Sequence, residues 1–376
     1  MDFTFTEEQQ AAAEAARAVF SGVAPDAVPS PALTPGAVAE DFDRPLWQRL
    51  ARADLLGLVV PQEHGGSGLG PLALCLVLRE AGRVLARVPL LETAAAALVL
   101  RACAAPETRH LLAPLARGEL VVTVAANGRT GHDAPTLSAT ATPHAGHWLL
   151  DGAHTAVPWA ATADRVLLPA HTPDGRTVLA LLPPGRTGIT LAEQVSTNGE
   201  RLAHLTLDSV RAEHTEMITA DGAWELLRTT LTCGTCALAL GLGEAAARMT
   251  SDYTSKREQF GHPLATFQAV AVQCADRYID LRAMEATLWQ AAWRLESGAP
   301  GPLPAAADVA VAKIWAAEGV RRVVQTAQHL HGGFGADTDY ALHRYHAWAK
   351  QLELALGPAA AHEEALGDLL AAHTPG

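Results

Sequence analysis

Two short segments combine residue types that suit a ligand carrying both phosphate and a flat ring. The first runs from Arg257 through Phe260 to Gln268, and the second contains Gly332 and Gly333. An arginine offers phosphate a planar, permanently charged fork of donors. Paired glycines let the backbone approach a ligand closely, and their N–H groups can cradle an anion. Phe260 can pack against a ring, while Gln268 offers its polar edges both a donor and an acceptor.

Each of these residues also has a purely structural explanation. Arg257 could be a surface arginine that follows a helix, and Gly261-His262-Pro263 could be a plain turn. Gly332-Gly333 could be a helix C-cap, where glycine is common. Taken singly, the residues leave both interpretations open.

Other chemistry has less support in the sequence. Cys233 and Cys236 have the C-x-x-C spacing of a redox pair, but they lie in an Ala/Leu-rich stretch that reads as one buried helix. We therefore expect Cys233 and Cys236 to be small, buried residues of that helix, with free thiols. The sixteen histidines form no H-E-x-x-H or comparable pair, so no metal site is predicted. The chain has no P-loop and no G-x-G-x-x-G after an expected strand, which argues against a Rossmann-type cofactor site.

The elements that must position these segments fall into three regions. Long apolar periodicity at both ends flanks short β-branched segments in the middle, which predicts an α+β fold. The expected strands of the middle region are 119–125, 136–142, 147–152, 165–169 and 177–182. We expect an N-terminal all-α domain at residues 1–117, a central small β-barrel domain at 118–215, and a C-terminal four-helix bundle at 216–376. The expected bundle helices are 221–257, 267–297, 304–331 and 341–372. Glu80 and Arg83 fit an i,i+3 surface ion pair.

Composition limits the partners and the compartment. The formal net charge is -12 and hydrophobic residues make up 49% of the chain. This charge is opposite to that of a bulk nucleic-acid binder. The polar, acidic N-terminus does not resemble a signal peptide, and the longest apolar runs fall short of a membrane span. We therefore expect a cytoplasmic protein that binds neither nucleic acid nor membrane.

Four segments, in the same order along the chain, resemble the acyl-CoA dehydrogenase family. They are LLGLVVPQEHGGSGLG with the following EAGRVL, the R-x-x-F-G-x-x-L-x-x-x-Q pattern from Arg257 to Gln268, His331-Gly-Gly-Phe-Gly335, and the tail from Asp339 to Lys350. The resemblance implies FAD as cofactor, with Arg257, Phe260, Gln268, Gly332 and Gly333 reaching the flavin of a neighbouring subunit. It also implies a homo- or hetero-oligomer with a related subunit, an acyl-CoA or acyl-carrier thioester as substrate, and an electron-transferring flavoprotein as acceptor.

The family reaction needs a carboxylate that this sequence does not place where the family has it. By resemblance, the carboxylate removes the α-proton of the thioester while the flavin accepts a hydride from the β-carbon. One family position falls on Leu356, just before Gly357, and the other falls near Leu231. Glu353 and Glu225 are the nearest acids, and each is offset to another helix face. The sequence therefore assigns no catalytic residue.

The contacts that would hold this chain's own flavin ring are also altered. The family's T-E-P-like loop corresponds to 123–131, where the acid and the proline are absent, and Pro158-Trp159-Ala160 replaces a W-I-T-like contact. His329 stands where the second motif has a glutamine, with Gln328 just before it. This pattern resembles the base-lacking partner subunit of actinobacterial heteromeric acyl-CoA dehydrogenases. Two alternatives stay open: a homomeric enzyme with a relocated base such as Glu353, or a family fold recruited to other chemistry.

Overall fold

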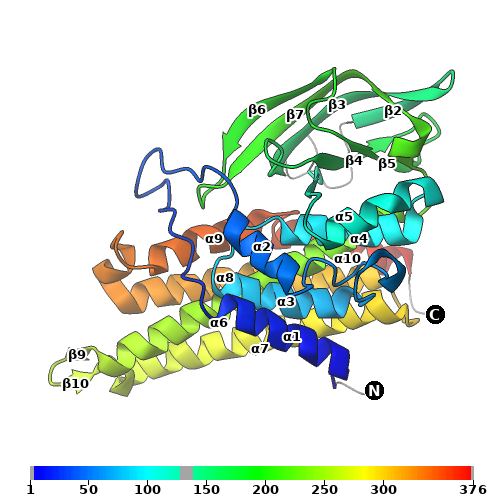
Figure 1. Cartoon of the computed structure of the whole chain (residues 1–376). Coiled ribbons are helices and arrows are strands. Elements are labelled where there is room, and N and C mark those ends of the chain that lie inside the picture. The colour runs from blue at the N-terminus through cyan, green and yellow to red at the C-terminus, as the bar shows by residue number, and fades with distance from the viewer. Residues whose placement is uncertain (1–3, 128–138, 374–376) are drawn as a thin grey trace.

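The computed structural model describes residues 4–127 and 139–373 and shows helices, then strands, then helices along the chain (Figure 1). This order confirms the predicted α+β architecture. The division after residues 117 and 215 is kept here as a proposal. The N-terminal helices are α1 (Glu7–Phe20), α2 (Arg44–Arg52), α3 (Pro71–Arg83), α4 (Leu90–Cys103) and α5 (Leu112–Ala116), with short 3-10 turns η1 (Gln62–His64) and η2 (Pro106–Leu111).

The central strands form one eight-stranded sheet that lies above the helices in Figure 1. The strands are β1 (Val122–Val124), β2 (Ala139–His144), β3 (His147–Pro158), β4 (Arg165–His171), β5 (Thr177–Leu182), β6 (Ile189–Val195), β7 (Arg201–Ala212) and β8 (Met217–Ile218), with the turn η3 (His214–Glu216) before β8. Their order is β6-β7-β3-β2-β4-β5-β8, and β1 pairs in parallel with β4. The sheet has its own apolar core, separate from a larger core shared by the helices.

Long helices form the C-terminal region. They are α6 (Ala223–Lys256), α7 (Gln268–Ser297), α8 (Ala305–His331), α9 (Leu342–Leu354) and α10 (Ala359–Ala372), with the hairpin strands β9 (Glu258–Gln259) and β10 (His262–Pro263) and the turns η4 (Leu264–Thr266) and η5 (Gly332–Ala336). The first three match their expected ranges within two residues. The single helix expected over 341–372 is wrong. It divides at Gly357, whose φ of 101° is outside the helical range, and Pro358 cannot continue a helix.

Helix α6 is long and apolar enough, among the described helices, to cross a membrane by composition alone. However, 83% of its most apolar window is buried inside the molecule, which is the pattern of a core helix. Cys233 and Cys236 are both buried on this helix, and all five cysteines are free. Burial raises the pKa of Cys236, which disfavours its reactive thiolate.

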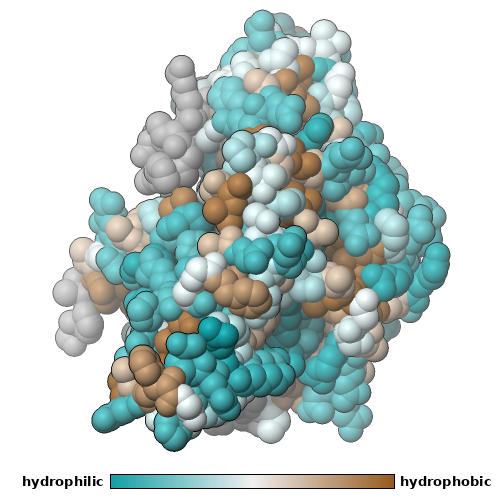
Figure 2. All heavy atoms as spheres, turned by 90° about the vertical axis from the view of Figure 1, so that its left-hand side faces the viewer, coloured by the Kyte–Doolittle hydropathy of each residue, from teal (hydrophilic) through white to brown (hydrophobic). Residues whose placement is uncertain are grey.

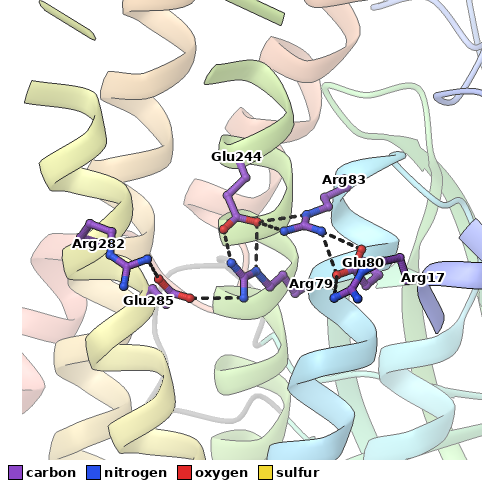
Figure 3. Close-up of polar contacts among 7 residues, drawn as sticks. All are labelled: Arg17, Arg79, Glu80, Arg83, Glu244, Arg282 and Glu285. Atoms are coloured by element: carbon purple, nitrogen blue, oxygen red, sulfur yellow. Dashed lines mark hydrogen bonds and ion pairs between the residues drawn. The ribbon is translucent and has the colours of Figure 1, made fainter. Parts of the chain in front are cut away.

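Charged side chains connect the N-terminal helices to the C-terminal bundle (Figure 3). Arg79 and Arg83 of α3 both bind Glu244 of α6, and Arg79 also reaches Glu285 of α7 at 3.3 Å. Glu80 accepts from Arg83 at 2.8 Å but is only 6% exposed. The ion pair forms, but the prediction that it lies at the surface is wrong, because both partners belong to a largely buried network between helices.

Candidate functional site

A two-residue hairpin turn presents the aromatic ring of the first motif to solvent. Phe260 and Gly261 both have positive φ, at 53° and 79°, and Gln259 pairs with His262 across the turn. Positive φ at both central residues is the requirement of a type I′ hairpin. Bulky residues rarely adopt this conformation, and Phe260 is 89% exposed. The chain therefore holds a large apolar ring away from its own core.

The charged and polar members of the motif lie beside this hairpin. Arg257 directly follows α6, and its backbone N–H donates to Tyr253 O at 2.8 Å. Its exposed guanidinium has no ion pair or side-chain hydrogen bond with any residue of the described ranges. Gln268 is the first residue of α7 and is exposed as well. Both side chains are thus available to a ligand from outside the chain.

Aromatic stacking brings the second motif to the same end of the bundle. The rings of Tyr253 and His331 lie 4.3 Å apart at 22°, and Tyr253 also stacks on Phe334 at 5.7 Å. Gly332 caps α8 with φ 62°, as the structural explanation required, yet a Cβ built on Gly332 or Gly333 meets nothing within 4 Å. The backbone there is open to an incoming group.

The five candidate residues therefore lie around one end of the helical bundle. Figure 2 faces this side of the molecule, where small apolar patches are scattered among hydrophilic ones. A groove of about 350 Å³ runs nearby between α6, α7 and α8, lined by Thr254, Ala265 and Val270 among others. An unpaired arginine, an exposed ring and open glycine backbone fit a pyrophosphate-bearing flavin nucleotide.

A separate cavity of about 430 Å³ lies where the α3–α4 segment, the sheet and α9 meet. The two positions to which the resemblance assigns the family's carboxylate both line it: Leu231 from α6 and Leu356 from the turn after α9. Of the described residues around the cavity, none belongs to the two motifs at the bundle end. The motif residues and this cavity therefore lie at different places in one chain.

The nearest acids to those positions do not line this cavity. Glu353 accepts a hydrogen bond from Lys350 at 2.6 Å, and Glu225 pairs with Arg228 at 3.0 Å. The backbone carbonyl of Glu353 also accepts from the buried Nζ of Lys313 at 3.1 Å. Each acid therefore already has a partner on its own helix. Their offset from the family positions stays a prediction.

Two acids that the sequence interpretation missed do line the cavity. Burial raises the pKa of Glu92 on α4 to about 8, and the neighbouring Glu200 adds to the rise. Burial likewise raises the pKa of Glu200 to about 7, although Arg87 opposes the effect. A lone glutamate in the apolar run LLETAAAALVL was the available signal for Glu92. No local pattern marks Glu200, which lies in the turn between β6 and β7.

An ion pair contacts residues that line the cavity. Arg87 binds the carboxylate of Asp26 and donates to Asn198 O at 2.8 Å. Trp348 of α9 donates its indole N–H to Asp26 at 3.0 Å, and the Arg87 guanidinium lies 5.1 Å from the Trp348 ring centre. These contacts join the N-terminal loop, the sheet and the bundle, and two of the residues involved, Asn198 and Trp348, line the cavity.

The structure describes only some of the residues that stand where the family contacts its flavin ring. Residues 128–131 of the altered loop lie outside the described residues, as do residues 136–138 of an expected strand. Asn127 and Trp159 both line the cavity. Gln328 donates to Gly332 O at 3.0 Å, so its side chain is engaged by its own motif, while His329 is exposed.

The fold and the site together define a protein of the acyl-CoA dehydrogenase type. The family model of the acyl-CoA dehydrogenase N-terminal domain matches residues 6–119, and that of the C-terminal domain matches residues 224–370. The chain belongs to the acyl-CoA dehydrogenase family, whose members are flavoprotein oxidoreductases.

Relatives cover almost the whole chain. Acyl-CoA dehydrogenase FadE27 of Mycobacterium tuberculosis is 36% identical over 99% of both chains. A solved variant of the Tcur3481-Tcur3483 steroid ACAD is 38% identical with a TM-score of 0.89, over 97% of this chain and 98% of that one. The ChsE4-ChsE5 complex from Mycobacterium tuberculosis is 34% identical with a TM-score of 0.88 over 100% of both chains. The resemblance found in the sequence is thereby confirmed.

Proposed function

We propose that this chain is the base-lacking, flavin-clamping subunit of a heteromeric FAD-dependent acyl-CoA dehydrogenase that oxidises an acyl thioester. The observation that carries the proposal is the pair of leucines, Leu231 and Leu356, at both carboxylate positions of one cavity. A leucine side chain has no group that can accept a proton. The proton acceptor would therefore come from a related subunit.

The exposed motif residues supply the other half of the proposal. Arg257 would pair with the pyrophosphate of FAD held by the related subunit, and Gly332 and Gly333 would present backbone N–H groups to it. Phe260 and Gln268 would contact its ring systems. FAD would supply the hydride acceptor for the reaction. Two relatives are solved structures whose names join two chains, which supports a heteromer.

The substrate and the remaining partners follow from the same proposal. We expect an acyl-CoA or acyl-carrier thioester as substrate and an electron-transferring flavoprotein as electron acceptor, in the cytoplasm. The names of the two solved relatives include a steroid acyl-CoA dehydrogenase. This supports a thioester with a bulky ring side chain.

A change at Arg257 tests the clamp. In the protein co-expressed with a related subunit that carries the carboxylate, Arg257→Gln should lower the FAD content per heteromer at least several-fold. Arg248→Gln is the matched control, because Arg248 is an exposed arginine two to three turns earlier on the same helix. Equal FAD content in the two variants, with intact heteromers by size, would rule the clamp out.

A homomeric dehydrogenase is the second candidate, and one observation favours it: the Glu92 carboxyl lines the cavity and has a pKa near neutrality. The alternative base from the sequence, Glu353, is paired with Lys350 instead. In the homomeric case the purified chain alone would dehydrogenate an acyl-CoA, and Glu92→Gln would abolish turnover while leaving FAD bound. Absence of turnover by the chain alone, with turnover restored by the related subunit, would exclude it.

A further inference from the structure

A polar hollow of about 440 Å³ lies between the glycine-rich loop that follows Val60 and the end of α4. Two arginines line it, Arg101 from the last turn of α4 and Arg109 from η2. Most of the other lining residues belong to the loop segment 61–68, which is part of the first family-like segment of the sequence. None of the described residues around this hollow lines the cavity of about 430 Å³ or belongs to the motifs at the bundle end. The hollow is therefore separate from both sites described above.

The protein holds one end of the Arg101 guanidinium and leaves one edge free. The Nη1 of Arg101 donates to three backbone carbonyls: Val59 O at 3.2 Å, Gly68 O at 3.2 Å and Leu69 O at 3.1 Å. Within the ranges that the structure describes, its Nε and Nη2 have no hydrogen-bond partner, and no carboxylate pairs with it. The Nε–Nη2 edge of a guanidinium can donate to two oxygens of one anion in parallel. The carbonyls thus fix the cation and leave a bidentate donor edge available.

Arg109 leaves the complementary part of its guanidinium free. Its Nε donates to Ala104 O at 3.2 Å. Its Nη1 and Nη2 have no hydrogen-bond partner among the described residues, and no carboxylate of those residues pairs with them. These two nitrogens form the end-on fork of the guanidinium, which also suits two oxygens of one anion. Two donor forks without an acidic partner therefore line one hollow.

The loop wall of the hollow is tightly folded. Ser67 N donates to Gly57 O at 3.0 Å, and Gly68 N donates to Val60 O at 2.8 Å. A Cβ at Gly66 would lie 2.1 Å from Val60 O and 2.4 Å from Gly57 O, so only glycine fits there. A wall that is already ordered loses little entropy when a ligand binds.

The charges around the hollow favour an anion with several acceptor oxygens. Arg101 and Arg109 carry two permanent positive charges, whereas Glu63 is the single acid of the described lining and pairs with neither of them. His64 and Ser67 add further hydrogen-bonding groups. This local positive charge contrasts with the formal net charge of -12 for the whole chain. A volume of about 440 Å³ lies in the range of small-molecule sites.

We propose that this hollow binds a phosphate group, whose oxygens accept hydrogen bonds from the Nε–Nη2 edge of Arg101 and from the Nη1–Nη2 end of Arg109. Phosphate offers enough acceptor oxygens for both forks at once. Inorganic phosphate and a small phosphate monoester share this chemistry, and the volume favours the monoester. No covalent step is involved. The inference does not rest on the proposed function, because it uses neither the flavin motifs nor the leucine-lined cavity.

A phosphorus NMR titration of the full chain with inorganic phosphate and with adenosine monophosphate tests the proposal. We expect the two to compete for one site and the monoester to bind more tightly. Tighter binding of inorganic phosphate would still support a phosphate site and would assign the free ion as its ligand. No binding of either compound, or equal displacement of both by acetate at the same ionic strength, would overturn the proposal.

A change at Arg109 locates the bound phosphate. Arg109→Gln removes the end-on fork and should weaken binding about fivefold, the upper range for an ion pair open to solvent. Arg165→Gln is the matched control, because Arg165 is also half-buried and donates to one backbone carbonyl, Asp164 O, at 3.1 Å. Equal weakening by the two changes would contradict the assignment.

Two further variants keep the proposal testable if Arg109→Gln fails to fold. Glu63→Gln removes the negative charge beside the arginines, so it should strengthen phosphate binding by about twofold or more. Arg257→Gln, at the bundle end, should leave phosphate binding unchanged. Unchanged affinity in Glu63→Gln, or loss of binding in Arg257→Gln, would place the phosphate outside this hollow and overturn the proposal.

Discussion

Leu231 of α6 and Leu356 after α9 line the same cavity, although they come from distant parts of the chain. The resemblance to the family assigns the carboxylate that removes a proton to one or the other of these positions. Because both leucines line the same cavity, neither position supplies a proton acceptor in place of the other. An acid elsewhere on the cavity wall would have to act from a different direction.

Glu353 should not be required for turnover. Its carboxylate is paired with Lys350, outside the cavity. In the heteromer, Glu353→Gln should change kcat less than about twofold and cost under about 1 kcal/mol of stability, as expected for a partly exposed pair. Lys350→Gln removes the other partner and is the control. A loss of kcat by tenfold or more in Glu353→Gln alone would restore the relocated-base hypothesis.

The network in Figure 3 should contribute strongly to stability. Glu244 receives hydrogen bonds from Arg79 and Arg83, so Glu244→Gln removes the charge of the one acceptor that these two partly buried arginines share. We expect a loss of about 2–4 kcal/mol in the free energy of unfolding at pH 7, measured by urea denaturation. Glu225→Gln, in an exposed pair with Arg228, should cost under about 0.5 kcal/mol. Equal losses would contradict the role given to the network.

The same network predicts the direction in which the stability of the protein changes with pH. The two arginines hold the pKa of Glu244 below its usual value, despite the opposing effect of burial. A depressed folded-state pKa adds stability that is present above the unfolded pKa and is lost as pH falls through the folded one. The penalty of Glu244→Gln should therefore shrink on acidification below about pH 4. A penalty that stays constant into that range would contradict the pairing.

Glu92 should make the protein less stable as pH rises. Because its folded pKa is raised to about 8, the unfolded chain loses this proton at lower pH than the folded chain does. Stability should fall between about pH 4.5 and pH 8, and Glu92→Gln should raise the melting temperature at pH 8.5 more than at pH 5.5. Glu63→Gln, at an exposed position, should do neither. An equal change at both pH values in Glu92→Gln would exclude a raised pKa.

The C-x-x-C pair should be chemically inert in the folded protein. Cys236 is buried, and Cys233 lies with its Sγ 3.7 Å from that of buried Cys75. The hydrogen bond with Cys75, together with burial, raises the pKa of the Cys233 thiol, and burial raises that of Cys236, so little thiolate is present. A thiol reagent added to native protein should modify Cys103 and Cys274 first. Fast modification of Cys233 or Cys236, identified by mass spectrometry, would revive the redox interpretation.

Local pattern predicted most of the fold. Helical periodicity placed α6, α7 and α8 within two residues at each end, because apolar spacing and flanking glycines are local signals. Gly357-Pro358 is also a local signal for a helix break, but the helical periodicity on both sides favoured one continuous helix. Strands β6 and β7 were not among the expected strands, although β7 alternates buried and exposed residues over much of its length.

Only the site residues that belong to sequence motifs could be predicted from the sequence. Arg257 and Gly332 were found through ordered motifs, and the structure brings them to one end of the bundle. The contact of Asp26 with Arg87, or the burial of Glu92 beside Glu200, depends on packing between segments far apart in the chain. No local pattern encodes such contacts, so the cavity's polar wall emerged only from the structure.

The FAD content per chain of the protein purified alone tests the central claim most directly. The account predicts an almost colourless protein, with FAD absorbance appearing only when a related subunit carrying the carboxylate is co-expressed. One FAD per chain in the isolated protein would contradict it, because this subunit would then build a complete flavin site without a partner.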